Sequence, residues 1–119
     1  MTDNKFLPII SERRTIKIEL ERVLYFEKNL RKLLVHMEEG QLEFYSRFKD
    51  IEEYLGENFY HCHKSYYVNL DKVVRIEPRT YWFEGGKWVP ISQLKYKEAK
   101  ERYQNYLREL CYCPPARYK

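Results

Sequence analysis

The stretch 59–69, which reads FYHCHKSYYVN, constrains the fold most strongly. Two arms rich in aromatic and β-branched residues flank a polar corner, His63-Lys64-Ser65. Tyr, Phe and Val favour a pleated, half-buried surface, so both arms are predicted to be strands. Because side chains alternate along a strand, one face of the first arm carries Phe59, His61 and His63, and the opposite face carries Tyr60 and Cys62. The corner then presents an ammonium, an imidazole and a hydroxyl at a strand end, which suits contact with an anion or a base edge.

Further strands are indicated by alternating or β-branched patterns elsewhere in the chain. They are expected over 15–20, 23–27, 33–37, 41–45, 72–77, 79–83 and 87–91, and a short strand also fits near 6–10. Gly85 and Gly86 suit a hairpin turn between the expected strands 79–83 and 87–91. Pro90 restricts the second of these strands to the edge of a sheet, or must lie at the end of the strand.

Two helices are predicted from capping residues and apolar spacing. Ser46 is expected to cap a helix over 47–55, and Ser92 a terminal helix over 93–110. The apolar stripe of the first comprises Phe48, Ile51 and Leu55, and that of the second Ala99, Tyr103, Tyr106, Leu107 and Leu110. Since no βαβ rhythm is present, the fold class is mostly β, a β-rich α+β arrangement of antiparallel strands with a short mid-chain helix and a C-terminal helix.

The length of 119 residues fits one domain. We expect 1–14 to be a leader or linker, 15–110 the folded domain and 111–119 a flexible tail. No apolar run approaches the roughly 18 residues of a membrane span, and no signal-peptide core is present, so a cytoplasmic location is expected. Three cysteines, an odd number, argue against a disulfide framework.

Charge is distributed unevenly along the chain, although the formal net charge is only +4. Residues 38–57 carry seven acidic side chains against two basic ones, and residues 87–119 carry eight basic against three acidic. Such polarity would orient the molecule in the field of a polyanion. Scattered solvated charge is the alternative, and the charge pattern alone leaves both open.

Metal binding and catalysis are not supported by the residue spacings. His61, Cys62 and His63 cannot converge on one ion, because Cys62 points to the opposite face of a strand, and Cys111 and Cys113 lack a partner pair. Ser65 or Cys62 beside His63 has neither a glycine-framed turn nor an orienting carboxylate. We therefore expect no cofactor, no metal and no enzymatic activity.

Polar loops that leave strand ends offer a third kind of chemistry. They span 28–32, 63–65 and 92–97, and each carries Lys or Arg. Lys and Arg neutralise phosphates, and Arg, Asn and Gln can hydrogen-bond base edges in pairs. From these residues alone, contact with nucleic acid and three ordinary solvated loops both remain possible.

Four segments in order resemble the LytTR DNA-binding domains, the output domains of many bacterial response regulators, the AgrA type among them. They are 23–27, ending aromatic-Glu; 41–45 before a short helix; the 59–69 signature; and Val89-Pro90-Ile91-Ser92. The resemblance covers about 15–107. It implies an elongated body of stacked antiparallel sheets that binds DNA without a recognition helix, laying loops into major grooves along one side of a bent duplex.

The resemblance also implies which residues contact DNA. Carried over by position, they are Lys28, Asn29, Arg31, Lys32, His63, Lys64, Ser65, Gln93 and Lys95. Of these, His63 is expected to brace its corner rather than to touch DNA. Gln93 stands where the family commonly has Arg, and since Gln pairs best with adenine and Arg with guanine, we expect a different base preference at that position.

The expected function is therefore sequence-specific binding of double-stranded DNA in transcriptional regulation, of the two-component or quorum-sensing output type or as a stand-alone regulator. The initial Met favours a complete short protein over an excised output half. Expected partners are promoter repeats and a second copy of the chain on DNA. A single-stranded nucleic-acid binder using stacked tyrosines and a protein-interaction module are the alternatives.

Overall fold

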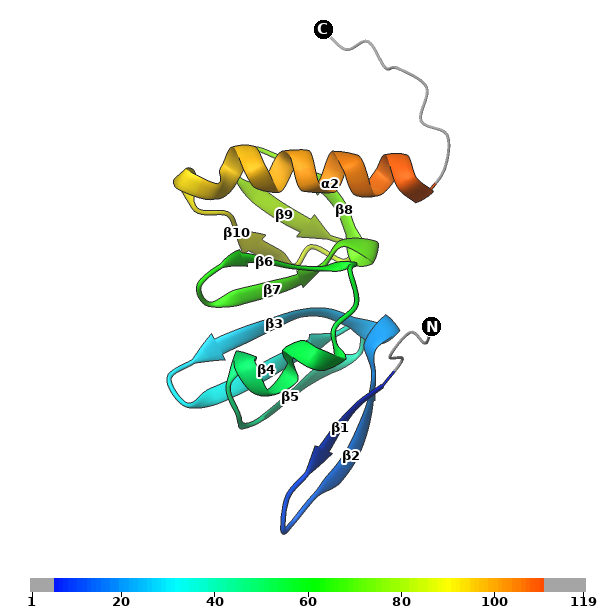
Figure 1. Ribbon diagram of the computed structural model, residues 1–119, viewed down its shortest axis with the longest axis vertical. Helices are drawn as coiled ribbons and strands as arrows, with labels where there is room; N and C mark the ends of the chain where they lie inside the picture. The colour runs from blue at the N-terminus through cyan, green and yellow to red at the C-terminus, as the bar shows by residue number, and fades with distance from the viewer. Residues whose placement is uncertain (1–5, 111–119) are drawn as a thin grey trace, which may run out of the picture.

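The computed structural model describes residues 6–110, which form three antiparallel sheets and two α-helices (Figure 1). The strands are β1 (Phe6–Ile10), β2 (Thr15–Glu19), β3 (Val23–Asn29), β4 (Lys32–Met37), β5 (Gly40–Tyr45), β6 (Phe59–His63), β7 (Tyr66–Asn69), β8 (Val73–Ile76), β9 (Thr80–Phe83) and β10 (Trp88–Pro90). The α-helices are α1 (Phe48–Ile51) and α2 (Tyr96–Leu110), and the 3₁₀ turns are η1 (Leu20–Arg22), η2 (Glu52–Tyr54), η3 (Leu70–Lys72) and η4 (Gln93–Lys95). The predicted mostly β fold class is confirmed.

The sheets are a five-stranded sheet in the order β5-β4-β3-β7-β6, a three-stranded sheet β10-β9-β8 and the hairpin β1-β2. In the large sheet the hairpins β3–β4 and β6–β7 are neighbours, because β3 pairs with β7 in the register Tyr25↔Val68, Phe26↔Tyr67 and Glu27↔Tyr66. The end of β3 therefore lies beside the start of β7. Antiparallel pairing thus brings the turns of both hairpins to the same end of the sheet, where the strands terminate.

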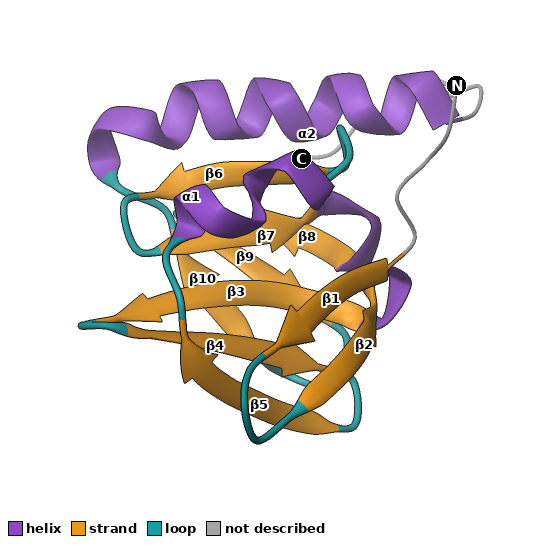
Figure 2. Cartoon of the chain, turned by 60° about the horizontal axis from the view of Figure 1, so that its bottom comes forward, coloured by secondary structure: helices purple, strands orange, loops and turns teal. Residues whose placement is uncertain are grey.

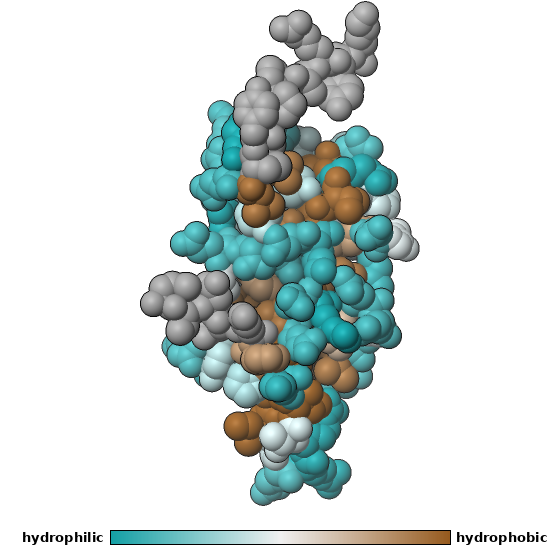
Figure 3. Space-filling model, turned by 90° about the vertical axis from the view of Figure 1, so that its right-hand side faces the viewer, coloured by the Kyte–Doolittle hydropathy of each residue, from teal (hydrophilic) through white to brown (hydrophobic). Residues whose placement is uncertain are grey.

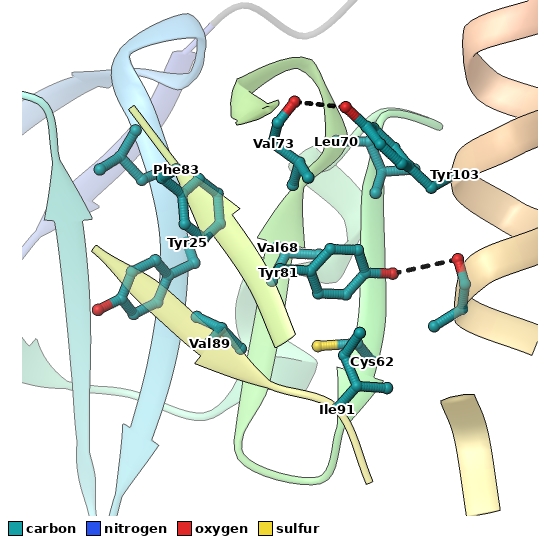
Figure 4. Close-up of a cluster of buried hydrophobic side chains, with 12 residues drawn as sticks. Tyr25, Cys62, Val68, Leu70, Val73, Tyr81, Phe83, Val89, Ile91 and Tyr103 are labelled. Carbon is teal, nitrogen blue, oxygen red and sulfur yellow. Dashed lines mark hydrogen bonds between the residues drawn. The ribbon is translucent and has the colours of Figure 1, made fainter. Parts of the chain in front are cut away.

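The first buried cluster lies between the large sheet, the small sheet and α2 (Figure 4). Tyr25 of β3 packs against Phe83 of β9, with ring centroids 5.4 Å apart. The Tyr103 hydroxyl of α2 donates to the Val73 carbonyl at 2.6 Å, which satisfies a polar tip inside an apolar layer. Tyr81, fully buried, points its hydroxyl at the Ala99 carbonyl of α2. These contacts fix the helix on the small sheet.

The second cluster covers the other face of the large sheet, where β1–β2 and α1 pack (Figure 2). Phe26 of β3 lies at its centre with an exposure of 0%, and its ring contacts Phe59 at 5.7 Å. Leu7 of β1 and Ile51 of α1 are also buried there. Because both faces of the large sheet are covered, β3 is buried over its first four residues instead of alternating.

Most predicted elements are confirmed, including the short strand near 6–10, the glycine turn with φ of +94° and +95° at Gly85 and Gly86, and Pro90 in an edge strand. The Ser92 cap is also confirmed, since its hydroxyl oxygen accepts from the Lys95 N–H at 3.2 Å. The expected tail, 111–119, lies outside the described residues. No helix within the described part of the chain is long and apolar enough to cross a membrane.

Some expectations on the helices were wrong. The mid-chain α-helix covers only 48–51 before turning 3₁₀, and its N-cap is Arg47 rather than Ser46. The Asp50 carboxylate accepts from the Arg47 backbone N–H at 3.2 Å, a bond that a Ser46 cap would not use. On α2, Leu107 and Leu110 are exposed by 38% and 60%, because the small sheet lies under only the first part of the helix.

The face predicted for His63 was also wrong. The β6–β7 register shifts between Tyr60 and His63, so His63 lies opposite Tyr66. Paired residues share a face, and Tyr66 packs on the cluster that contains Cys62. A β-bulge therefore turns His63 away from the side of Phe59 and onto the face that Tyr66 occupies.

Candidate nucleic-acid interface

All three predicted loops lie along one side of the molecule. The β3–β4 turn, the β6–β7 turn and η4 follow one another on the left of Figure 1 and stay on that side in Figure 2. The backbone N–H of Lys28 donates to the Ser65 carbonyl at 2.8 Å, which links the first loop to the second. The Lys95 ammonium donates to the His61 carbonyl at 3.2 Å, which links the third to β6. The loops therefore form one continuous edge, which we call the loop edge.

The first loop is shorter than expected, because β3 continues to Asn29 and β4 begins at Lys32. Only Leu30 and Arg31 form the turn, and Lys28, Asn29, Arg31 and Lys32 are all exposed. The Lys32 ammonium lies 3.2 Å from a Glu43 carboxylate oxygen on β5. An open depression of about 520 Å³ is lined by Asn29, Leu30, Arg31, Lys32 and Tyr45.

The second loop is a tight corner held by its own histidine. The backbone N–H of Ser65 donates to Nδ1 of His63 at 3.1 Å, so this nitrogen is an acceptor. The His63 ring also meets the Tyr66 ring, with centroids 5.5 Å apart. The hydrogen bond by which His63 was expected to hold this corner is therefore present. Lys64 is exposed at the corner, and Ser65 is half-buried.

The third loop is the 3₁₀ turn η4, where Gln93 is exposed and Lys95 half-buried. The Lys95 ammonium lies 5.8 Å from the centre of the Tyr60 ring as well as on the His61 carbonyl. Lys95 therefore ties η4 to β6, and its charge is held close to the sheet. The exposed amide of Gln93 extends from an anchored turn, which suits a group that must present hydrogen-bond donors and acceptors in a fixed direction.

A hydrogen-bonded contact between His36 and Glu27 behind the loop edge supports β3 and β4. Nε2 of His36 lies 2.8 Å from a Glu27 carboxylate oxygen, and the His36 ring stacks on Tyr25 at 4.2 Å. Burial lowers the pKa of His36 and outweighs the opposing effect of Glu27. Glu27 is thus engaged on the protein side, and the exposed side chains of the first loop beyond it are Lys28, Asn29, Leu30, Arg31 and Lys32.

Other chemistries find little support in the described residues. Within 6–110, no group of three or more His, Cys, Asp or Glu could hold a metal ion. Cys62 is buried, and burial raises its thiol pKa to about 12, so it is a poor nucleophile at neutral pH. Among the tyrosines of this part of the chain, Tyr45 alone is largely exposed, so these residues present no row of stacking platforms. The side opposite the loop edge is largely hydrophilic, with scattered apolar patches (Figure 3).

Two residues of the loop edge were missed by the sequence reasoning. Leu30 and Leu94 are 88% and 97% exposed, and both lie in turns that carry predicted contacts. The signal was present, since each is an apolar residue inside a basic or polar loop. The predicted contacts were chosen by charge and hydrogen-bonding capacity, and leucine has neither.

Comparison with known proteins gives the following matches. The family model described as the LytTr DNA-binding domain matches residues 13–104. A solved structure, the LytTr DNA-binding domain of a Bacillus cereus protein described as a methyl-accepting/DNA response regulator, superposes with a TM-score of 0.64 at 25% identity, covering 89% of this chain and 95% of that one. A search of curated proteins finds no match.

Proposed function

The chain belongs to the LytTR family of DNA-binding domains, and from that premise we propose that its loop edge reads double-stranded DNA in the major groove to regulate transcription. The observation that carries this proposal is the linkage of three polar loops along one side by the Lys28–Ser65 and Lys95–His61 hydrogen bonds. Three connected loops can meet one side of a duplex together. No helix needs to enter a groove.

Affinity in this proposal comes mainly from phosphate contacts. Lys28, Arg31, Lys32 and Lys64 are exposed on the edge, and each cation that neutralises a phosphate releases counterions. Lys95 adds a positive charge close to the sheet while it holds η4 against β6. The backbone contacts set the position of the domain on the duplex, and the base contacts then choose the sequence.

Specificity comes from the exposed groups that can bond a base edge. Asn29 and Gln93 carry amides suited to adenine N6 and N7, and Arg31 carries a guanidinium suited to guanine O6 and N7. Ser65 can supply a hydroxyl beside Lys64, and His63 keeps that corner in shape. Replacing Gln93 by Arg is therefore expected to change the preferred base at one position from adenine to guanine.

The regulatory setting we propose is a bacterial promoter that carries repeated sites, bound in the cytoplasm by two copies of the chain. The family model and the response-regulator relative support an output role in signalling. Bending of the duplex toward the loop edge would add readout at base pairs that the protein does not touch.

The test is selection of random duplexes by the purified chain, followed by binding titrations on the selected site. One variant combines Arg31→Gln, Lys32→Gln and Lys64→Gln. Its matched control combines Arg13→Gln, Arg14→Gln and Arg108→Gln, which removes the same charge from the β1–β2 turn and the end of α2. Circular dichroism establishes that both variants fold.

We expect the loop variant to lose affinity and to flatten the dependence of log Kd on log salt by about one for each phosphate contact removed. The control is expected to change little. Retained site occupancy by the folded loop variant would contradict the proposal. Tighter binding of single strands than of duplex would favour the single-strand alternative, and no nucleic-acid affinity would favour a protein-interaction module.

A further inference from the structure

Leu30 sits in a conformation and an environment that its side chain disfavours. It is the first residue of a two-residue hairpin turn between the paired residues Asn29 and Lys32. Its φ is +61°, and among the described non-glycine residues it alone has a positive φ. Glycine or asparagine would fit such a turn better, because a Cβ meets the backbone in the left-handed region. The side chain is also 88% exposed, so it gains no burial in return.

Leu94 shares the exposure of Leu30, though not its positive φ, at the other end of the loop edge. It is 97% exposed in η4, next to Gln93 and Lys95. Ser92 caps the turn and Lys95 ties it to β6, so the position of Leu94 is fixed while its side chain projects outward. An apolar side chain on an anchored turn has the preorganisation that a contact residue needs.

The surroundings of Leu30 indicate what could cover it. Exposed Arg31 and Lys32 follow it in the chain, and the open depression beside it is also lined by Tyr45, which is 76% exposed. Because the neighbours are cationic, the expected occupant is anionic overall but must offer an apolar group at close range. The major groove of DNA meets both conditions, since the thymine 5-methyl group is an apolar group on its floor, among acceptors and donors.

We propose that Leu30 and Leu94 are specificity residues that contact thymine 5-methyl groups in the major groove. The inference rests on the proposed function and names part of what the loop edge reads. Leu94 has a further reason to meet thymine. Gln93 beside it is suited to adenine N6 and N7, and an A·T pair displays those atoms and the thymine methyl side by side in the major groove.

The experiment replaces single thymines of the selected duplex by deoxyuridine, which removes only the methyl group. The wild-type chain, Leu30→Ala and Leu94→Ala are titrated against every such duplex, which gives a double-mutant cycle for each pair of leucine and methyl. The matched control is Leu110→Ala, an exposed leucine at the far end of α2. We expect the wild type to lose affinity about fourfold for each contacted methyl, the value of one buried methyl-sized group.

The double-mutant cycles show whether each leucine contacts a particular thymine methyl group. Leu30→Ala is expected to abolish discrimination at one thymine and Leu94→Ala at another, while Leu110→Ala discriminates like the wild type. Discrimination that persists in both variants, or wild-type affinity that ignores every methyl, would overturn the inference while leaving DNA binding intact. Wild-type chain that selects no duplex at all would instead overturn the proposed function.

A second variant, Leu30→Gly, keeps the turn and removes the strain. It is expected to raise the melting temperature and to lose the same thymine discrimination as Leu30→Ala. A melting temperature below that of the wild type would show that Leu30 stabilises the fold, and its exposure would then need a structural explanation rather than a role in recognition.

Discussion

At the scale of single residues, Asn69 shows how one buried side chain can fix the start of several elements. It is fully buried at the end of β7, and its amide nitrogen donates to the Val23 carbonyl at 2.8 Å. Its amide oxygen accepts from Asn58 at 2.8 Å and from the Asp71 N–H at 3.0 Å. The last residue of the signature stretch thus joins the beginning of β3, the segment before β6 and the turn after β7.

Replacing Asn69 by Ala is expected to lower the free energy of unfolding by about 3 kcal/mol, because it leaves the buried Val23 carbonyl and the half-buried Asp71 N–H without their partner. Urea titration measures the loss. Asn58→Ala is the control, since it removes only the bond to the Asn69 oxygen and is expected to cost about 1 kcal/mol. Equal losses in the two variants would contradict the central role of Asn69.

At the scale of elements, β3 is the strand on which the loop edge depends. It pairs with β4 on one side and β7 on the other, contributes to both buried clusters and ends in the first loop. Its partner β4 carries His36, which is 8% exposed and bonded to Glu27 of β3. Burial also lowers the pKa of His61 on β6. Both histidines therefore favour the neutral form in the folded state.

This makes folding stability dependent on pH in a defined window. A histidine whose pKa is lowered by folding binds its proton more tightly when unfolded, so the stability it supports is complete above the ordinary value of 6.5 and is lost as pH falls below it. We expect the free energy of unfolding to be lower at pH 5.5 than at pH 7.5, measured by urea titration, and His36→Gln to reduce that difference. The pKa values of Glu38 and Asp50 are lowered by Lys72 and Arg47 respectively, so protonation of these carboxylates reduces folding stability only at a lower pH. Stability that rises on acidification would contradict this assignment.

The elements that the sequence predicted well are those whose signals are local. Aromatic and β-branched arms with a polar corner gave β6 and β7, and the cap at Ser92 gave the last helix. The β-bulge before His63 and the early end of α1 were not predicted, because both depend on what the segment packs against. The hydrogen-bonded linkage of the loops was not predicted either, because it follows from the pairing of β3 with β7, which are distant in the chain. The candidate contacts with DNA remain predictions. The exposed Leu30 and Leu94 were not among them, because those predictions rested on charged and polar residue types.

At the scale of the whole molecule, the loop edge has a size that can be compared with DNA. The strands β4, β3, β7 and β6 are successive neighbours, and strands lie about 4.8 Å apart, so the two hairpin turns span roughly 15 Å. The turn η4 continues the row at the β6 end, where Lys95 holds it. One turn of B-DNA is about 34 Å long. A single copy of the chain should therefore contact one face of the duplex over about one helical turn or less.

Two copies bound to repeats would then lie on the same face only when the repeats are separated by whole turns, about 10.5 base pairs or a multiple. We expect that inserting 5 base pairs between naturally spaced sites abolishes cooperative binding, because the second copy is rotated to the opposite face, and that inserting 10 largely restores it. Titration of a two-site duplex by gel shift measures the cooperativity, and a one-site duplex controls for the intrinsic affinity. Hydroxyl-radical cleavage should show protection on one face only. Protection around the whole duplex, or cooperativity indifferent to the 5-base-pair insertion, would mean that contacts outside the loop edge hold the chain on DNA.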